Sequence, residues 1–370
     1  MYNEEKLVRI AKRENNNKRK YLVVNALQGK HIPVSPKESF DMFDALAEIV
    51  SKSYNNEKLL LVGFAETATA IGASLAVKLD TYYMQTTREI IDNVDYLFFT
   101  ESHSHATEQK LVKNDIDKII NKIDRIVFIE DEVTTGNTIL GIVNIIKKIY
   151  GDSIRFSVAS LLNGMDENSL DMYKKYVINV HYLVKTNHSA YTQISEGFAG
   201  DGQNFICNDD SIDTDIAYNS YDVFGDYINA RCLTKGSEYL CACESLVKQI
   251  QNKLPAITEQ KVLVIGTEEF MYPALFVAKK LEEDNNTVKC HSTTRSPITV
   301  STEKKYPLHI RYQLTSFYDD SRTTFIYDLN NYDKVIIITD SKNKSSAGIN
   351  SLINAVASCG NSDITIFRWC

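Results

Sequence analysis

From Tyr21 onward the chain alternates short runs of β-branched and other apolar residues with amphipathic stretches. Such alternation is typical of βαβ units and predicts an α/β fold with a mainly parallel sheet. We expect strands at 21–25, 58–63, 81–84, 95–99, 125–130, 155–160 and 177–183. Apolar residues at 3-to-4 spacing predict helices at 39–51, 70–79 and 138–149. These elements form an expected first domain, 1–190.

A second alternating segment begins near Glu238 and predicts a second domain, 236–370. Its expected helices are 238–253 and 271–282, and its expected strands are 261–266, 287–291, 308–313, 324–327, 334–339 and 364–368. Residues 185–226 are instead rich in Asn, Asp, Ser and Gly and show no sustained period. We therefore expect 191–235 to be a polar connection with little regular structure.

The second half repeats short stretches of the first half in the same order. Leu61-Val62-Gly63 is echoed by 264–266, and Thr86-Thr87-Arg88 is echoed by 293–295. An apolar run that ends in acidic residues, 126–131, is echoed by 335–340. Repeats in the same order predict two tandem copies of one α/β fold, of which the second is degenerate.

Composition narrows the class of protein. The chain has 370 residues, of which 44% are hydrophobic and 24% charged, which is typical of a globular protein with two or three domains. The net charge of −7 argues against a general nucleic-acid binder. No apolar run approaches the ~18–20 residues of a membrane span, and the N-terminus lacks a signal-peptide pattern. We expect a cytoplasmic protein that binds neither nucleic acid nor membrane.

Two kinds of site are not expected from the motifs. Cys241 and Cys243 form a C-x-C pair, but no second pair lies at zinc spacing, so we expect no metal site built from protein side chains. No GxxxxGK[ST] motif occurs, so a Walker A nucleotide site is not expected either.

The segment 126–138 carries the strongest chemical signal. A buried strand is expected to end in Glu130 and Asp131, and a hydroxyl- and glycine-rich turn then leads into an amphipathic helix. Backbone N–H groups and the positive end of the helix dipole favour an anion at such a turn. The expected phosphate-binding residues are Thr134, Thr135, Gly136, Asn137 and Thr138.

The acid pair suggests what the phosphate is attached to. Two carboxylates would repel a phosphate, but Glu130 and Asp131 are suited to accept hydrogen bonds from a vicinal diol. A diol at one end and a phosphate at the other describe a ribose 5-phosphate. The alternative is that both acids merely cap the following helix.

This segment resembles the phosphoribosyl pyrophosphate (PRPP) loop of type I phosphoribosyltransferases. The wider pattern, at 29–34, 63–68, 86–89 and 103–107, resembles the phosphoribosyltransferase family encoded in tellurite-resistance-associated (ter) operons. The second half resembles the TRSP domain that accompanies this family, through 266–272 and the tetrapeptide Thr294-Arg295-Ser296-Pro297. The two matches leave only the polar connection uncovered.

The resemblance implies roles for residues in the first half. Ala65, Glu66 and Thr67 would bind pyrophosphate through backbone N–H groups, although a plain strand-to-helix turn is the alternative. Arg88 lies where related orotate-type enzymes hold the pyrophosphate, although an arginine at a strand end is often a surface ion pair. Glu130 and Asp131 would position the ribose, and Asp131 would add negative potential beneath the reacting carbon.

The resemblance also implies roles for residues outside these loops. His103 and His105 lie in the segment that closes over the reaction centre in such enzymes, where they would contact pyrophosphate or handle a proton; the alternative is no role. Lys30 and His31 lie in the region that lines the base site. Arg295 would recognise an anion on the acceptor, whereas the alternative for the second domain is a purely structural role.

The implied activity is transfer of ribose 5-phosphate from PRPP to a nitrogenous base or base-like acceptor, with release of pyrophosphate. Mg²⁺ would enter mainly through the pyrophosphate of PRPP, and the ter-type resemblance points to biosynthesis of a nucleotide- or nucleoside-like metabolite. A non-catalytic PRPP- or nucleotide-binding regulator is the alternative. A PRPP synthetase ranks last, because there the intact loop belongs to the second copy. A homodimer is an open expectation.

Overall fold

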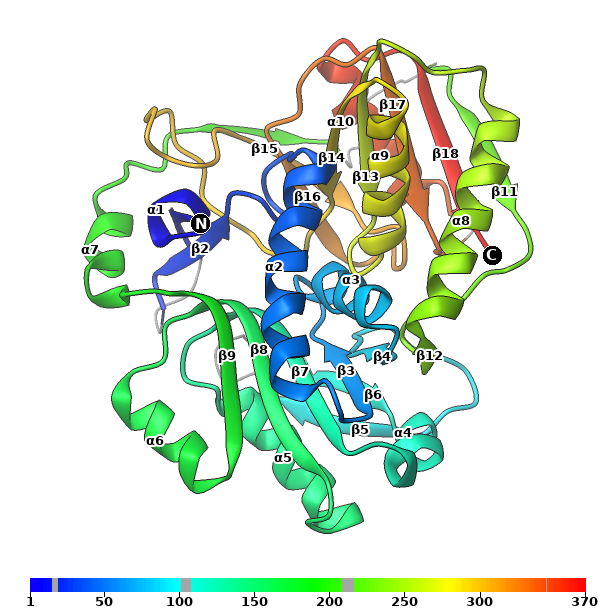
Figure 1. Cartoon of the computed structure of the whole chain (residues 1–370). Helices are drawn as coiled ribbons and strands as arrows, with labels where there is room; N and C mark the ends of the chain where they lie inside the picture. Colours follow the sequence, from blue (N-terminus) through cyan, green and yellow to red (C-terminus); the bar gives the residue numbers. More distant parts are fainter. Residues whose placement is uncertain (15–18, 101–107, 208–215, 344) are drawn as a thin grey trace. The chain divides into compact units, whose positions relative to one another are not determined.

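A computed structural model shows that the chain forms two compact units (Figure 1). The structure describes residues 1–14, 19–100, 108–207, 216–343 and 345–370. The first unit comprises 1–4, 40–187 and 228–242, and the second comprises 5–39, 188–227 and 243–370. The expected boundaries at 190 and 236 stay a prediction, but the N-terminal segment 5–39 groups with the second unit.

The first unit contains a six-stranded sheet in the order β12-β4-β3-β7-β8-β9. Its strands are β3 (Leu59–Gly63), β4 (Tyr82–Gln85), β7 (Arg125–Val133), β8 (Arg155–Asn163), β9 (Ile178–Lys185) and the short β12 (Thr234–Lys235). All neighbouring strands are parallel except the β12–β4 pair. The associated helices are α3 (Thr69–Leu79), α4 (Lys113–Ile119), η1 (Ile120–Lys122), α5 (Asn137–Tyr150) and α6 (Glu167–Lys175), and β5 (Tyr96–Thr100) pairs with β6 (Glu108–Val112) in a hairpin.

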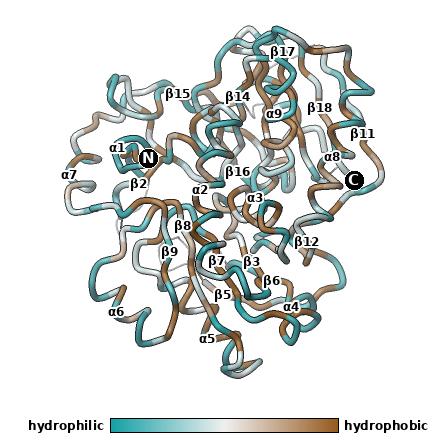
Figure 2. The backbone as a smooth tube through the Cα atoms, viewed as in Figure 1, coloured by the Kyte–Doolittle hydropathy of each residue, from teal (hydrophilic) through white to brown (hydrophobic). Residues whose placement is uncertain are grey.

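Continuous apolar runs explain why the central strands are buried. Ile126, Val127, Phe128 and Ile129 of β7 are completely buried, as expected for a parallel strand covered on both faces. The ring of Phe128 stacks on that of Phe156 in β8, with 6.3 Å between the ring centroids. Figure 2 shows a hydrophobic stretch along β8, in contrast to the hydrophilic α6.

The second unit contains a five-stranded parallel sheet in the order β11-β18-β17-β13-β14. Its strands are β11 (Asn219–Val223), β13 (Lys261–Gly266), β14 (Thr287–Ser292), β17 (Lys334–Thr339) and β18 (Ile364–Trp369). A smaller sheet consists of β10 (Gln203–Ile206), β15 (Ile310–Thr315) and β16 (Thr323–Tyr327), and β1 (Val8–Lys12) pairs with β2 (Tyr21–Asn25). The helices are η2 (His188–Ala190), α7 (Tyr191–Glu196), α9 (Tyr272–Glu283) and α10 (Ala347–Ser358), while α1 (Glu4–Leu7), α2 (Pro36–Tyr54) and α8 (Gly236–Lys253) contain residues of both units.

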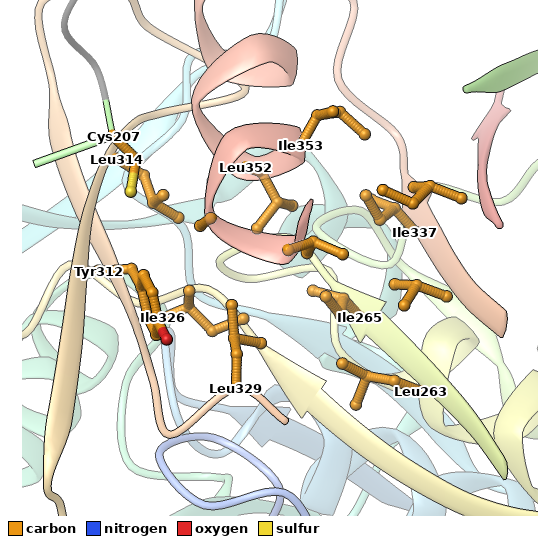
Figure 3. Close-up of a cluster of buried hydrophobic side chains, with 14 of the residues drawn as sticks. Cys207, Leu263, Ile265, Tyr312, Leu314, Ile326, Leu329, Ile337, Leu352 and Ile353 are labelled. Carbon is orange, nitrogen blue, oxygen red and sulfur yellow. The ribbon is translucent and has the colours of Figure 1, made fainter. Parts of the chain in front are cut away.

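The core of the second unit lies between its sheet, α10 and the β15–β16 hairpin (Figure 3). Leu352 of α10 points toward Ile265 of β13, and Leu314 and Tyr312 of β15 approach from the other side. A second cluster explains why the N-terminal segment belongs to this unit, because Ala11 and Val24 pack among buried residues from 298–327.

The strand order of the first sheet recurs in the second. The order β4-β3-β7-β8 matches β14-β13-β17-β18, and each set is accompanied by an antiparallel hairpin, β5–β6 or β15–β16. The chain is therefore an α/β protein with two parallel-sheet regions. Descent of both regions from one phosphoribosyltransferase fold stays a prediction.

The expectation of little regular structure in the connection was wrong. Residues 191–235 contain α7, β10, β11 and β12, and the last three are edge strands of their sheets. Strand β10 is exposed along its whole length, so backbone pairing with β15 forms it without an apolar pattern of its own. In the described part of the chain, no helix has the length and apolar character that crossing a membrane requires.

Candidate functional site

The candidate site lies at the carboxyl edge of the first unit's sheet. Strands β4, β3 and β7 are parallel neighbours, so the segments that follow them meet at this edge. These segments carry most of the residues expected in the first domain. They are Ala65, Glu66, Thr67, Arg88, Glu130, Asp131, Thr134, Thr135, Gly136, Asn137 and Thr138.

The expected phosphate turn connects β7 to α5. The strand continues to Val133, three residues beyond the expected end, so Glu130 and Asp131 lie within it. Gly136 is the N-cap of α5, at φ 71°, and the helix has no side-chain cap. The alternative that the two acids cap this helix was therefore wrong.

Three backbone donors of this turn have no hydrogen-bond partner within the described part of the chain. The N–H groups of Thr134, Gly136 and Thr138 donate no hydrogen bond there, and Asn137 N donates only a long one, 3.4 Å, to Thr135 Oγ1. Unsatisfied N–H groups at a helix N-terminus are suited to bind a phosphate. The turn therefore has the donors that the sequence interpretation requires.

Tyr173 of α6 supports the turn through a contact with the backbone of Gly136. Its side chain is completely buried, and its hydroxyl donates a 2.8 Å hydrogen bond to the carbonyl of Gly136. A Cβ atom at position 136 would lie 2.3 Å from that hydroxyl oxygen. Glycine is therefore required at this position both by φ and by the approach of the tyrosine.

The two acids lie between the neighbouring loops. Asp131 accepts a side-chain hydrogen bond from Thr67, in the loop after β3. Burial, followed by the negative charge of Glu130, raises the pKa of the Tyr173 hydroxyl. Burial, followed by the negative charge of Glu132, raises the pKa of Asp131 to about 6. Asp131 is half-buried and forms no salt bridge within the described residues.

The loop after β3 is held from within the protein. The N–H of Ala65 donates to Thr86 Oγ1 at 2.8 Å, and the carbonyl of Ala65 accepts from Gln109 Nε2 at 2.6 Å. The backbone groups of Ala65 are thus used internally, so its expected contact with pyrophosphate cannot use this N–H. Arg88 is half-buried beyond β4, and its carbonyl accepts from Lys110 Nζ at 3.3 Å.

His103 and His105 lie outside the described residues. Strand β5 ends at Thr100 and β6 begins at Glu108, so both histidines belong to the segment that joins the two strands of the hairpin. Their expected role stays a prediction.

Three further expected residues belong to the second unit. The ammonium group of Lys30 is fully buried and donates to the carbonyls of Glu268 and Thr293, at 2.7 and 2.8 Å. His31 is buried, and its ring meets that of Tyr327 edge-on. These contacts give Lys30 a structural function within the second unit.

Arg295 lies in a buried ion-pair cluster of the second unit. Its guanidinium group donates to Glu268 at 2.6 Å and to Glu269 at 3.3 Å, and both carboxylates are almost completely buried. Arg322 also contacts Glu268, at 3.0 Å. The adjoining Thr294 pairs with Phe325 of β16 through two backbone hydrogen bonds. The tetrapeptide 294–297, which follows β14, thus contacts both the strand β16 and the loop after β13.

The turn after β17 corresponds in order to the phosphate turn, but its own side chains accept hydrogen bonds from four of its N–H groups. Alternate residues accept from the N–H two positions ahead, at 3.0 to 3.2 Å; the acceptors are Thr339, Ser341, Asn343 and Ser345. Asp340 accepts from the hydroxyls of Tyr318 and Tyr227, at 2.6 and 2.8 Å. This turn therefore differs from the first in the donors it can offer a ligand.

Sequence reasoning missed three residues at the first site: Gln109, Glu132 and Tyr173. Glu132 was visible as the third acid of the run after Ile129, and it affects the pKa of Asp131. Gln109 and Tyr173 come from other elements, β6 and α6, and no local pattern distinguishes them. Only the fold shows that they hold the two loops.

Comparison with known proteins gives the family. Residues 7–191 match the family described as phosphoribosyl transferase, and residues 235–356 match the TRSP domain that lies C-terminal to it. None of the curated proteins matches the chain.

Several solved structures are similar at low identity. Adenine phosphoribosyltransferase from Trypanosoma brucei is 15% identical with a TM-score of 0.34, over 49% of this chain and 77% of that one. The enzyme from Leishmania tarentolae is 15% identical with a TM-score of 0.35, over 49% and 85%. Orotate phosphoribosyltransferase from Aeropyrum pernix is 14% identical with a TM-score of 0.28, over 44% and 78%. Because the phosphoribosyl transferase model covers half of the sequence, the chain belongs to that family and carries its C-terminal TRSP domain.

Proposed function

We propose that the first unit transfers ribose 5-phosphate from PRPP to a nitrogenous base or base-like acceptor and releases pyrophosphate. One observation carries this proposal: within the described residues, the N–H groups of Thr134, Gly136 and Thr138 donate no hydrogen bond, and they lie at the same sheet edge as Asp131 and the loop 64–68. The turn offers hydrogen-bond donors to a phosphate, the acids offer acceptors to a diol, and the loop 64–68 is a second place for an anion. These three features match the 5-phosphate, the ribose and the pyrophosphate of PRPP.

The residues of the site have distinct tasks in this proposal. The turn after β7 holds the 5-phosphate, while Glu130 and Asp131 accept hydrogen bonds from the ribose hydroxyls. As the bond between C1 and pyrophosphate loosens, positive charge develops on the ribose ring, and the charge of Asp131 stabilises it. The acceptor nitrogen then attacks C1 from the opposite face. The protein acts through positioning and electrostatics.

The donor set fits Mg²⁺ that enters with the substrate. In the residues that the structure describes, no three metal-ligating side chains gather, while carboxylates are present on β7. Mg²⁺ prefers oxygen ligands and is commonly held by one or two carboxylates, water and substrate phosphates. Glu130 and Asp131 are the residues available to it, and bound Mg²⁺ would neutralise charge on the pyrophosphate leaving group.

The acceptor identity is not encoded in these loops. The ter-type resemblance supports biosynthesis of a nucleotide- or nucleoside-like metabolite. The alternative function, regulation by bound PRPP or nucleotide without turnover, requires the same phosphate turn but no chemistry at C1.

The test is pyrophosphate release by the full chain with PRPP, Mg²⁺ and a panel of purine, pyrimidine and related bases. We expect release with at least one base, and its loss in Asp131→Asn but not in Asp152→Asn, an exposed aspartate paired with Lys147. PRPP binding without release across the panel would identify a regulator. A chain that neither binds PRPP nor releases pyrophosphate would contradict the proposed function.

A further inference from the structure

A closed ring of hydrogen bonds surrounds the peptide groups of Ala65. Ala65 N donates to Thr86 Oγ1 at 2.8 Å, and the Thr86 hydroxyl donates to Gln109 Oε1 at 2.8 Å. Gln109 Nε2 then donates to the carbonyl of Ala65 at 2.6 Å and closes the ring. Thr86 N also donates to the carbonyl of Gly63, at 2.9 Å. The donor and acceptor of Ala65 are thus both fixed by two side chains.

The ring is shielded from water. Gln109 and Thr86 are completely buried, and Ala65 is only 5% exposed. A buried carbonyl or N–H that loses its partner is not compensated by solvent, so each bond of the ring counts for more than a surface bond. The order of donors also fixes the orientation of the Gln109 amide, because only its nitrogen can donate to the Ala65 carbonyl.

The side chain of Gln109 comes from an element separate from the loop that it holds. It belongs to β6, and the same strand docks on the end of β4, where Thr87 and Lys110 exchange two backbone hydrogen bonds of 2.9 Å. The hairpin, the end of β4 and the loop after β3 are therefore joined at one point. Local sequence around Ala65 cannot supply this connection.

We propose that Gln109, together with Thr86, is a positioning residue for the pyrophosphate end of the site. By holding Ala65, the pair sets the path of the adjoining Glu66 and Thr67, and Thr67 in turn donates to Asp131. The turn 134–138 has a separate support, the hydrogen bond from the Tyr173 hydroxyl to the carbonyl of Gly136. This inference rests on the proposed function, since it assigns the loop 64–68 to pyrophosphate.

The test compares two ligands that each occupy one end of the site: inorganic pyrophosphate with Mg²⁺, and ribose 5-phosphate. Affinities are measured calorimetrically for the full chain, for Gln109→Met and for Thr86→Val. Both variants keep side-chain size but remove ring donors or acceptors. We expect pyrophosphate to bind about 10- to 100-fold more weakly, because a loop that the ring no longer holds presents its groups to the ligand out of place. Ribose 5-phosphate, whose phosphate is held by the turn 134–138, is expected to lose much less affinity than pyrophosphate does.

Two further variants separate positioning from general loss of structure. Thr86→Ser keeps the hydroxyl and is expected to retain pyrophosphate affinity. Tyr173→Phe removes the support of Gly136 and is expected to give the reverse pattern, with weaker ribose 5-phosphate binding and unchanged pyrophosphate binding.

Distinct outcomes overturn distinct claims. Equal weakening of both ligands in Gln109→Met, or unchanged pyrophosphate affinity in both Gln109→Met and Thr86→Val, would overturn the positioning role while the proposed function stands. A wild-type chain that binds neither ligand would overturn the proposed function and this inference with it. If Gln109→Met fails to fold, the positioning role is tested by the pyrophosphate affinities of Thr86→Val and Thr86→Ser. Equal affinities of these two variants would overturn it.

Discussion

Replacement of Asp131 by asparagine is expected to stabilise the first unit while it lowers activity. Burial and the charge of Glu132 raise the pKa of Asp131 from an ordinary 3.8 to about 6, so the fold disfavours the ionised carboxylate. The difference corresponds to about 3 kcal/mol between the two protonation states. Because the side chain is half-buried and solvent screens part of its charge, we expect about 1–3 kcal/mol at pH 8.

The sign of the pH dependence follows from proton linkage. Between pH 3.8 and about 6 the folded protein binds more protons at Asp131 than the unfolded chain does. The contribution of this group to the free energy of unfolding therefore falls as the pH rises through that window, and the full penalty is present above it. The substituted asparagine side chain does not titrate, so the gain in stability from Asp131→Asn should be largest at pH 8 and absent near pH 4.

The assay is urea unfolding of wild type and Asp131→Asn at pH 4 and pH 8, with Asp152→Asn as the control. Asp152 is 84% exposed, so its replacement should change stability little at either pH. In parallel, kcat/KM for PRPP should fall about 10- to 100-fold in Asp131→Asn, because a charge-assisted hydrogen bond to the ribose is lost. Destabilisation by Asp131→Asn at both pH values, or a gain independent of pH, would refute the reasoning.

Three more substitutions test other contacts. Gly136→Ala places Cβ against Tyr173 at positive φ, and we expect a loss of about 2–4 kcal/mol in urea unfolding and weaker ribose 5-phosphate binding in calorimetry. Arg295→Met leaves the buried carboxylate of Glu268 short of a cation, which should lower the unfolding free energy by about 3–5 kcal/mol without changing pyrophosphate affinity. Lys30→Met leaves two buried carbonyls without their donor, and we expect a loss of at least about 2 kcal/mol, measured in the same way.

The sequence predicted the parallel strands well because they are buried on both faces. The strands 261–266 and 334–339 have the bounds expected from their apolar runs, and those of the first sheet differ by one to three residues. Strands without such a run were missed, such as β10, whose side chains are all exposed, and β6, which pairs with β5. Both strands form by backbone pairing with a partner strand, β15 for β10 and β5 for β6, and not through an apolar run of their own.

The candidate site was predictable where one strand and its following turn carry the chemistry. Glu130, Asp131 and the turn 134–138 are contiguous, so spacing alone brings them together. Gln109 acts through a hydrogen bond to a residue 44 positions away, which no local pattern contains. Lys30 follows a strand end, as a binding residue would, but a fully buried ammonium group bonded to carbonyls shows a structural contact. Burial distinguishes a structural lysine from a ligand-binding one, and it cannot be known before the fold is known.

The two strand-end turns show why a repeated strand order does not by itself repeat a function. Both follow a central apolar strand and lead into a helix, α5 or α10. After β17, four side-chain acceptors spaced two residues apart take four N–H groups of the turn, so binding a phosphate through those groups would require breaking the bonds. After β7, one such bond is present, from Asn137 N to Thr135 Oγ1 at 3.4 Å, and Gly136 has no side chain to accept another. Within the described residues, the N–H groups of Thr134, Gly136 and Thr138 donate no hydrogen bond. Anion binding depends on which donors the turn leaves unsatisfied, and side-chain spacing decides this within the same architecture.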